Sequence, residues 1–219
     1  MIKADHNKIA RLIFIPYMNR LLRKNFSAFY LVNDIPTIPK EAGIVITPNH
    51  ISWWDGFFAE YLFSRTINRK LHIMMLEEQL SKFWFFKYLG AYSLYPGKAK
   101  SIIDTANYTS DLVNDRENFS IIYPQGEIEA FEKRPLTIKK GIRFLIRDVK
   151  REFYVLPVGF KIEYYDEKYP AVITRFGKLI SGRIIEEDFD SFEKEFYANL
   201  DLLAEASYTK SFNKNLFKK

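Results

Sequence analysis

The sequence predicts an α/β protein with a mostly parallel central sheet, helices on both faces of that sheet, and an amphipathic helical segment at the N-terminus. Short runs of β-branched and other apolar residues alternate with longer amphipathic stretches, which is typical of strands and helices in such folds. At 219 residues the chain suits one ordinary domain. Its hydrophobic share of 47% is too high for a disordered chain.

Residues 1–34 are predicted to form the amphipathic helical segment. Apolar residues recur at helical spacing among basic ones: Ile9, Leu12, Ile13, Met18, Leu21 and Leu22 beside Lys8, Arg11, Arg20, Arg23 and Lys24. Two interpretations fit this pattern. The helix either packs on the core of the domain or lies on a membrane surface, where apolar and basic residues are favoured together.

Residues 35–219 are predicted to form a single α/β domain. Five runs have the composition of buried strands: "IVIT", "LHIMML", "FSIIYP", "YVLPVGF" and "AVITRF". Helical patterns cover about 53–64, 99–114, 136–149 and 187–206. This alternation predicts helices on both faces of a parallel sheet and ligand sites beyond the carboxyl ends of its strands. The segments "NHISWWD" and "YPQGE" each follow such a strand.

The composition narrows the chemistry and the partners. Cysteine is absent, which excludes disulfides, thiolate zinc sites and cysteine nucleophiles, and with only three histidines we do not expect a histidine-rich metal site. The net charge of +6 favours anionic partners, namely nucleic acid, an anionic membrane surface or phosphorylated small molecules. The sequence has no basic stripe or RNP-like aromatic pattern, so a nucleic-acid partner is not expected.

The hydropathy pattern predicts where the protein works. The longest uncharged run, from Ala42 to Trp54, is shorter than the roughly 18 residues of a spanning helix. The N-terminus has no small-residue cleavage site after an apolar core, so no signal peptide is predicted. We therefore expect a protein that is made and kept in the cytoplasm.

The segment "NHISWWD" has two interpretations. As local structure it matches a capping box, with Ser52 at the N-cap and Asp55 three residues later. As chemistry, a loop-to-helix corner brings the carboxylate of Asp55 to one ring nitrogen of His50, where it fixes the tautomer while the other nitrogen accepts a proton. The nucleophile is then a hydroxyl of the substrate. A hydrolase with Ser52 as nucleophile is disfavoured because the sequence has no G-x-S-x-G elbow.

Several segments in the same order resemble the glycerolipid and lysophospholipid acyltransferase family, of the lysophosphatidic acid acyltransferase type. "NHISWWDG" resembles the first motif of that family, and "EEQLSKFWFFKYLGAYSLYPG" is similar to the second block. "IIYPQGE" resembles the third motif, "IKKGIRFLI" the lysine-glycine helix that follows it, and "VLPVGF" the fourth motif. The resemblance covers about residues 42–160.

The resemblance implies transfer of an acyl group from acyl-CoA or acyl-carrier protein to a hydroxyl of a lysolipid or related lipid acceptor at a membrane surface, without a metal or other cofactor. With this resemblance, the protein is expected to be peripheral on the inner face of the membrane. His50 is then the general base and Asp55 its orienting partner. The candidate substrate-binding residues are Asn49, Ser52, Tyr95, Lys98, Lys100, Pro124, Gln125, Gly126, Glu127 and Lys139. The alternative is a catalytically inactive relative that binds lipids or membranes.

The sequence departs from the family pattern where that pattern recognises phosphate. Pro96 occupies the place of an arginine in the second motif, and Ile128 that of an arginine in the third. Gln125 replaces a glutamate, and we expect it to bind acceptor hydroxyls together with Glu127. Lysines near these positions supply positive charge, but they do not reproduce a bidentate arginine. The acceptor therefore need not be lysophosphatidic acid.

Overall fold

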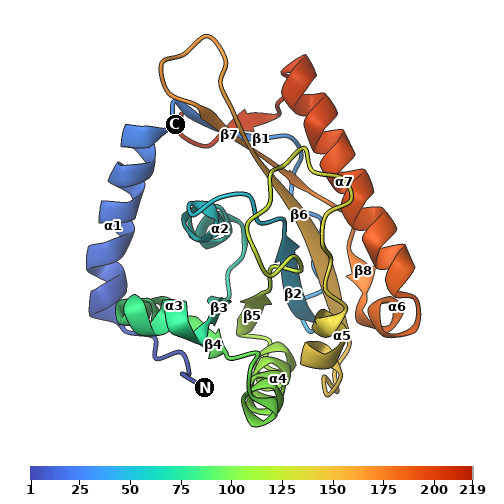
Figure 1. Ribbon diagram of the computed structural model, residues 1–219. Coiled ribbons are helices and arrows are strands. Elements are labelled where there is room, and N and C mark those ends of the chain that lie inside the picture. The colour runs from blue at the N-terminus through green and yellow to red at the C-terminus, as the bar shows by residue number, and fades with distance from the viewer. Residues whose placement is uncertain (219) are drawn as a thin grey trace.

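A sheet of nine strands forms the centre of the computed structural model, which describes residues 1–218 (Figure 1). The strands are β1 (Ala28–Leu31), β2 (Gly43–Pro48), β3 (Lys70–Leu76), β4 (Ala91–Leu94), β5 (Asn118–Ile121), β6 (Phe153–Glu163), β7 (Ala171–Phe176), β8 (Ile180–Ser181) and β9 (Lys214–Asn215). Their order across the sheet is β4-β3-β5-β2-β6-β7-β1-β9, with β8 paired to β6. Strands β4, β3, β5, β2 and β6 are mutually parallel, and β7 runs antiparallel to β6.

Helices cover both faces of the sheet, so the predicted fold class is confirmed. They are α1 (Lys8–Asn25), α2 (Asp55–Thr66), α3 (Glu77–Lys82), the 3₁₀ helix η1 (Trp84–Leu89), α4 (Ala99–Asn114), α5 (Gly141–Ile146), α6 (Gly182–Glu187) and α7 (Phe189–Thr209). One buried cluster packs α1 and α2 against the sheet, and a second packs α4 to α7 against the opposite face. Figure 1 shows α1 and α2 on the left of the sheet and α7 on its right.

The position of β2 between two buried clusters explains why both faces of the strand are apolar. Ile44 and Ile46 point into the cluster beneath α2, whereas Val45 points into the cluster beneath α4 to α7. Successive side chains of a strand face opposite sides of a sheet, so a strand covered on both faces needs an unbroken apolar run. "IVIT" is such a run.

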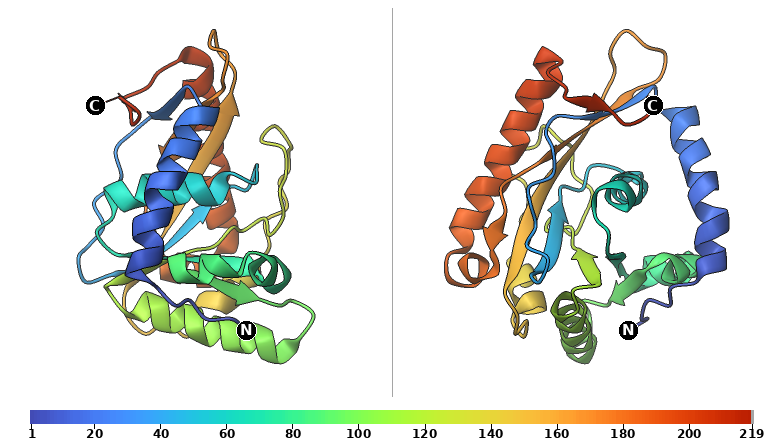
Figure 2. Two further views of the ribbon diagram at one scale, coloured as in Figure 1. Left: turned by 90° about the vertical axis from the view of Figure 1, so that its left-hand side faces the viewer. Right: turned by 180° about the vertical axis from the view of Figure 1, so that it is seen from behind.

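Helix α1 packs on the domain with one side only. Met18 and Leu22 are fully buried, and Arg11 donates a hydrogen bond of 2.6 Å to the buried carboxylate of Glu60 on α2. On the other side, Leu12 is 75% exposed, and Ile9, Ile13 and Tyr17 are exposed with it. Figure 2 shows α1 beside α2, with its N-terminal end next to α3. No helix within residues 1–218 is both long enough and apolar enough to cross a bilayer.

The structure differs from the expected elements mainly in its short ones. The helix predicted over 136–149 is reduced to Gly141–Ile146, because residues 136–140 belong to a long loop that crosses the carboxyl edge of the sheet. Helix α2 begins at Asp55, after a turn that includes Ser52. Sequence analysis does not predict β1, which lies within the N-terminal segment and pairs with β7, far away along the chain.

Candidate active site

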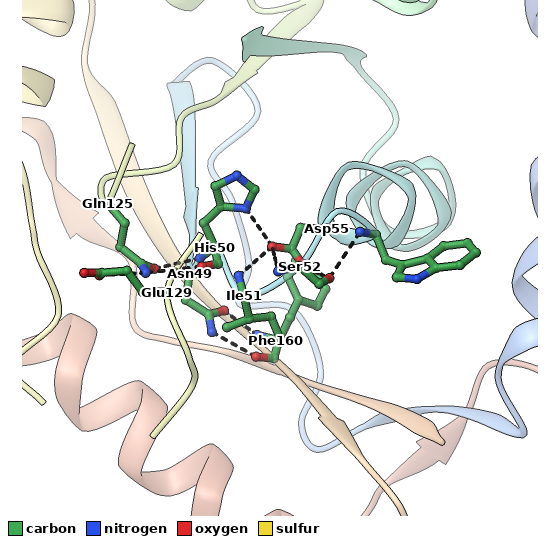
Figure 3. A network of polar contacts seen from close by, with 9 residues as sticks. Asn49, His50, Ile51, Ser52, Asp55, Gln125, Glu129 and Phe160 are labelled. Atoms are coloured by element: carbon green, nitrogen blue, oxygen red, sulfur yellow. Dashed lines mark hydrogen bonds and ion pairs between the residues drawn. The ribbon is translucent and has the colours of Figure 1, made fainter. Parts of the chain in front are cut away.

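His50 and Asp55 lie in contact where β2 passes into α2. The Nδ1 atom of His50 is 2.7 Å from Oδ2 of Asp55 (Figure 3). A carboxylate only accepts hydrogen bonds, so Nδ1 carries the ring proton and Nε2 presents a lone pair. The His50 side chain is 25% exposed, whereas Asp55 is fully buried. The pair therefore has the geometry of a general base oriented by a buried carboxylate.

The turn before α2 holds the Asp55 carboxylate in place. Its Oδ2 accepts the N–H of Ile51 at 2.7 Å and the N–H of Ser52 at 2.9 Å, and its Oδ1 accepts the Ser52 hydroxyl at 2.7 Å. The Ser52 hydroxyl also accepts the N–H of Trp54 at 3.2 Å. The predicted N-cap role of Ser52 is wrong, because the N-cap of α2 is Trp54, which makes no side-chain cap bond. The bonds between Ser52 and Asp55 instead close the turn that precedes the helix. Asp55 also lies at the positive N-terminal end of α2, which stabilises its charge.

Asn49 fixes the start of the same loop. The residue is fully buried, and its side chain donates to Phe160 O at 2.9 Å and accepts from Phe160 N at 2.7 Å. Both polar atoms of the amide are therefore engaged with β6. In this structure Asn49 anchors the His50 loop and does not face a substrate.

Gln125 holds His50 from the neighbouring strand. Strands β2 and β5 are adjacent and parallel, so the loops at their carboxyl ends meet. The fully buried Gln125 accepts the N–H of His50 at 2.6 Å, and its amide donates to Glu129 at 3.1 Å. The role expected of Gln125, binding acceptor hydroxyls, does not match this geometry, because the side chain is sealed from solvent.

Tyr123 packs on the imidazole of His50, with ring centroids 4.5 Å apart. Its hydroxyl is buried and has no hydrogen-bond partner among the described residues. Burial and, after it, the negative charge of Asp55 raise the pKa of Tyr123 well above its ordinary value. The phenol therefore stays protonated and forms one uncharged wall of the site.

The rest of the "YPQGE" turn lies beside this site. Gly126 has φ +71°, a left-handed conformation that favours glycine, and the flexible end of the Lys139 side chain lies over it, with Nζ 2.8 Å from where a Cβ would be. The N–H of Gly126 closes the turn on Tyr123 O at 3.1 Å, and the backbone of Lys139 bonds to Pro124 O at 2.9 Å. Pro124 is buried, whereas Gly126, Glu127, Ile128 and Lys139 are exposed. Among these residues, Lys139 brings positive charge to the turn.

Tyr95, Lys98 and Lys100 form a separate group. They are exposed where the turn after β4 passes into α4, which begins at Ala99, at the same edge of the sheet as His50. Strands β3 and β5 lie between β4 and β2, so this turn is separated from the His50 loop by about 14 Å of sheet width. The structure thus brings together Asn49, His50, Ser52, Asp55 and Gln125, and places the two lysines of this turn further along the edge.

Sequence analysis did not single out Tyr123 and Glu129. Tyr123 lies within "IIYPQGE", the segment that resembles the third motif, but only the residues that follow it were predicted to belong to the site. The only local signal for Glu129 is a lysine four residues later, and exposed surface loops often carry such spacing by chance. Within residues 1–218, no three histidine or acidic side chains gather as metal ligands.

Exposed apolar side chains lie on the turn before α2, on η1 and on the outer side of α1. Trp53 is 57% exposed and its ring packs edge-on against Phe57, which in turn contacts Phe14 of α1 and Phe86 of η1. Trp84 and Phe85 of η1 are exposed as well. An aromatic layer therefore connects the His50 loop to the exposed side of α1. We use the name apolar face for the exposed residues Ile9, Leu12, Ile13, Tyr17, Trp53, Trp84 and Phe85.

Comparison with known proteins identifies the family of this chain and proteins of similar fold. The family model described as Acyltransferase matches residues 30–161, which is more than half of the chain, and the protein belongs to this family. The crystal structure of the 1-acyl-sn-glycerophosphate (LPA) acyltransferase PlsC from Thermotoga maritima has a similar fold, with a TM-score of 0.61 and 16% sequence identity, over 88% of this chain and 77% of that one. A comparison with curated protein sequences gave no match.

Proposed function

We propose that this acyltransferase moves a fatty acyl group from a thioester, acyl-CoA or acyl-carrier protein, to a hydroxyl of a lysolipid or related lipid. The observation that carries the proposal is the 2.7 Å contact between His50 and Asp55, which leaves Nε2 of His50 available at the carboxyl edge of the sheet. The family match and the PlsC fold support the reaction class.

The reaction needs one base and no protein nucleophile. Nε2 of His50 accepts the proton of the acceptor hydroxyl as its oxygen attacks the thioester carbonyl. The tetrahedral intermediate then expels the thiolate as the C–S bond breaks, and His50 returns the proton to give the free thiol. Asp55 stabilises the imidazolium that forms between these steps. Such proton transfer contributes a factor of about 10²–10⁴ to the rate.

The apolar face supports work at a lipid surface. Aromatic and aliphatic side chains beside basic residues suit the boundary between headgroups and acyl chains. The exposed residues Lys8, Arg20 and Lys24 of α1 and Lys82 of α3 lie among or next to the apolar ones along the chain. We propose that this face binds the membrane and that the protein draws its acceptor from it.

The proposal includes an expectation for the headgroup of the acceptor. Pro96 and Ile128 are exposed, and neither side chain has a hydrogen-bond donor for a phosphate. A lysolipid without a free phosphate monoester, or the hydroxyl of a sugar or amino-acid lipid, therefore suits the site at least as well as lysophosphatidic acid.

Thiol release from a long-chain acyl-CoA and from an acyl-carrier protein, each with a panel of lysolipids, tests the proposal. We expect release that depends on the acceptor. A folded, liposome-bound protein that releases no thiol with any pair would favour the alternative, a lipid-binding relative without turnover.

A further inference from the structure

The loop after β5 holds His50 by its backbone on both sides of the residue. Gln125 accepts the N–H of His50 at 2.6 Å, and its Nε2 donates to His50 O at 3.3 Å. The N–H of Glu129 donates to the same carbonyl at 2.9 Å. The position of the imidazole therefore depends on this loop as well as on Asp55.

Glu129 is a buried carboxylate with a full set of donors. It accepts from the amide of Gln125 at 3.1 Å, from the N–H and the hydroxyl of Thr137 at 2.9 Å each, and from Lys133. Burial alone would raise the pKa of Glu129, but these hydrogen bonds outweigh it and lower the pKa to about 2. The group is thus ionised, and it can only accept hydrogen bonds.

An ionised Glu129 dictates which way the Gln125 amide faces. The NH₂ group must point at the carboxylate, and this leaves the Gln125 oxygen for the N–H of His50. A glutamate at position 125, as the family resemblance implies, would place a second carboxylate oxygen 3.1 Å from Glu129 and 3.3 Å from the carbonyl of His50. The amide at 125 and the carboxylate at 129 therefore depend on each other.

We propose that Gln125 and Glu129 act as one positioning pair for His50, in which the Glu129 carboxylate orients the Gln125 amide and that amide sets the backbone of His50. Neither side chain touches the substrate. The rate effect of the pair rests on the proposed function, because it is exerted through His50. Displacement of a catalytic group by about 1 Å can cost a factor of roughly 10² in rate.

The test is an exchange of the two side chains. We expect Gln125→Glu to lower kcat at least about tenfold, with KM for the acyl donor little changed. In the double variant with Glu129→Gln, an amide at position 129 donates to the carboxylate at position 125. We therefore expect kcat of the double variant to be at least about threefold higher than that of Gln125→Glu alone. Recovery is partial because the N–H of Thr137 loses its charged acceptor. Should Gln125→Glu not fold, the uncharged Gln125→Met is expected to show the same loss of kcat.

Asn33 offers a matched control. Its amide binds the backbone N–H and C=O of Phe176 in the same way, with two bonds of 2.9 Å. Asn33 follows β1, and strands β6 and β7 lie between β1 and β2, which precedes the His50 loop. Asn33→Asp removes one donor, as Gln125→Glu does, and is expected to leave kcat within about twofold of wild type. A folded Gln125→Glu or Gln125→Met with wild-type kcat would overturn the proposal, as would a folded double variant no better than Gln125→Glu.

A second readout is independent of turnover. The proton on Nδ1 of His50, shared with Asp55, gives a far-downfield NMR resonance. We expect this resonance to shift or broaden in Gln125→Glu, to return towards its wild-type position in the double variant, and to stay unchanged in Asn33→Asp. An unchanged resonance in Gln125→Glu would contradict the positioning role. Absence of thiol release in wild type, with this NMR pattern present, would instead count against the proposed reaction.

Discussion

Nδ1 of His50 lies 2.7 Å from Oδ2 of Asp55, and the same oxygen accepts the N–H groups of Ile51 and Ser52. One buried oxygen thus orients the imidazole and also closes the turn that starts α2. The fold uses Asp55 for helix initiation and the chemistry uses it for orientation, so its replacement should affect both stability and rate.

Ser52→Ala tests whether the serine is structural. The change removes the 2.7 Å bond to Asp55 Oδ1 and the acceptor for the N–H of Trp54. Loss of these bonds costs about 1–3 kcal/mol in the free energy of unfolding, because the N–H of Trp54 loses its acceptor. We expect urea denaturation to show this cost and kcat to fall less than about tenfold, because Asp55 keeps its other bonds. A folded variant as inactive as His50→Ala would make Ser52 a nucleophile.

The lowered pKa of Glu129 predicts that the free energy of unfolding depends on pH in the acid range. Its pKa is about 2 in the folded protein against an ordinary value of 4.5. Between these two values the unfolded chain binds a proton that the folded protein does not, so the free energy of unfolding rises with pH in this window. The contribution is fully present above about pH 5 and is lost as the pH falls towards 2. Urea unfolding at pH 3 and pH 6 should therefore show a smaller difference in Glu129→Gln than in wild type; an equal difference would contradict the assignment.

The apolar face predicts a defined defect in membrane binding. We expect Leu12→Glu combined with Ile13→Glu to weaken binding to anionic vesicles at least tenfold in a flotation assay, since each buried aliphatic side chain contributes about 1.5–3 kcal/mol. Leu202→Glu on α7 is the control, because Leu202 is 45% exposed outside the apolar face. Equal binding of all three proteins would remove α1 from the membrane contact.

Pro96→Arg probes the missing phosphate recognition. Position 96 is exposed on the turn after β4, where an arginine can reach solvent-borne ligands without disturbing the core. We expect the variant to raise kcat/KM for lysophosphatidic acid relative to a phosphate-free lysolipid by roughly tenfold, the size of a charge-assisted hydrogen bond. Pro96→Ala controls for loss of the proline ring. The premise is wrong if lysophosphatidic acid is already the best acceptor of the wild-type protein.

The fold was accessible to sequence reasoning where periodicity is strong. Helix α4 lies at Ala99–Asn114, as predicted, because its apolar positions repeat at helical spacing. Strands β2, β3, β5, β6 and β7 were likewise visible as apolar runs. Strand β1 and the two-residue β9 were not, because so short a strand is specified by the partners it meets and not by its own pattern.

The candidate site could likewise be predicted only in part: its contacts between residues near in sequence, but not those between residues far apart. His50 and Asp55 are five residues apart, so local geometry and motif resemblance suffice to suggest their contact. Gln125 and Glu129 reach His50 across 75 and 79 positions of sequence, and the path of a long loop decides their burial. The sequence therefore predicts that Gln125 meets the substrate, whereas the structure buries its side chain behind His50.

The most direct test of the account is thiol release by His50→Ala and Asp55→Asn, measured beside wild type with the best donor and acceptor pair. Asp55→Asn keeps the size of the side chain, and circular dichroism and urea unfolding establish that both variants are folded. The account predicts that acceptor-dependent release falls by at least about 10² in each variant. Wild-type rates in either folded variant would contradict the assignment of His50 as the base and Asp55 as its partner.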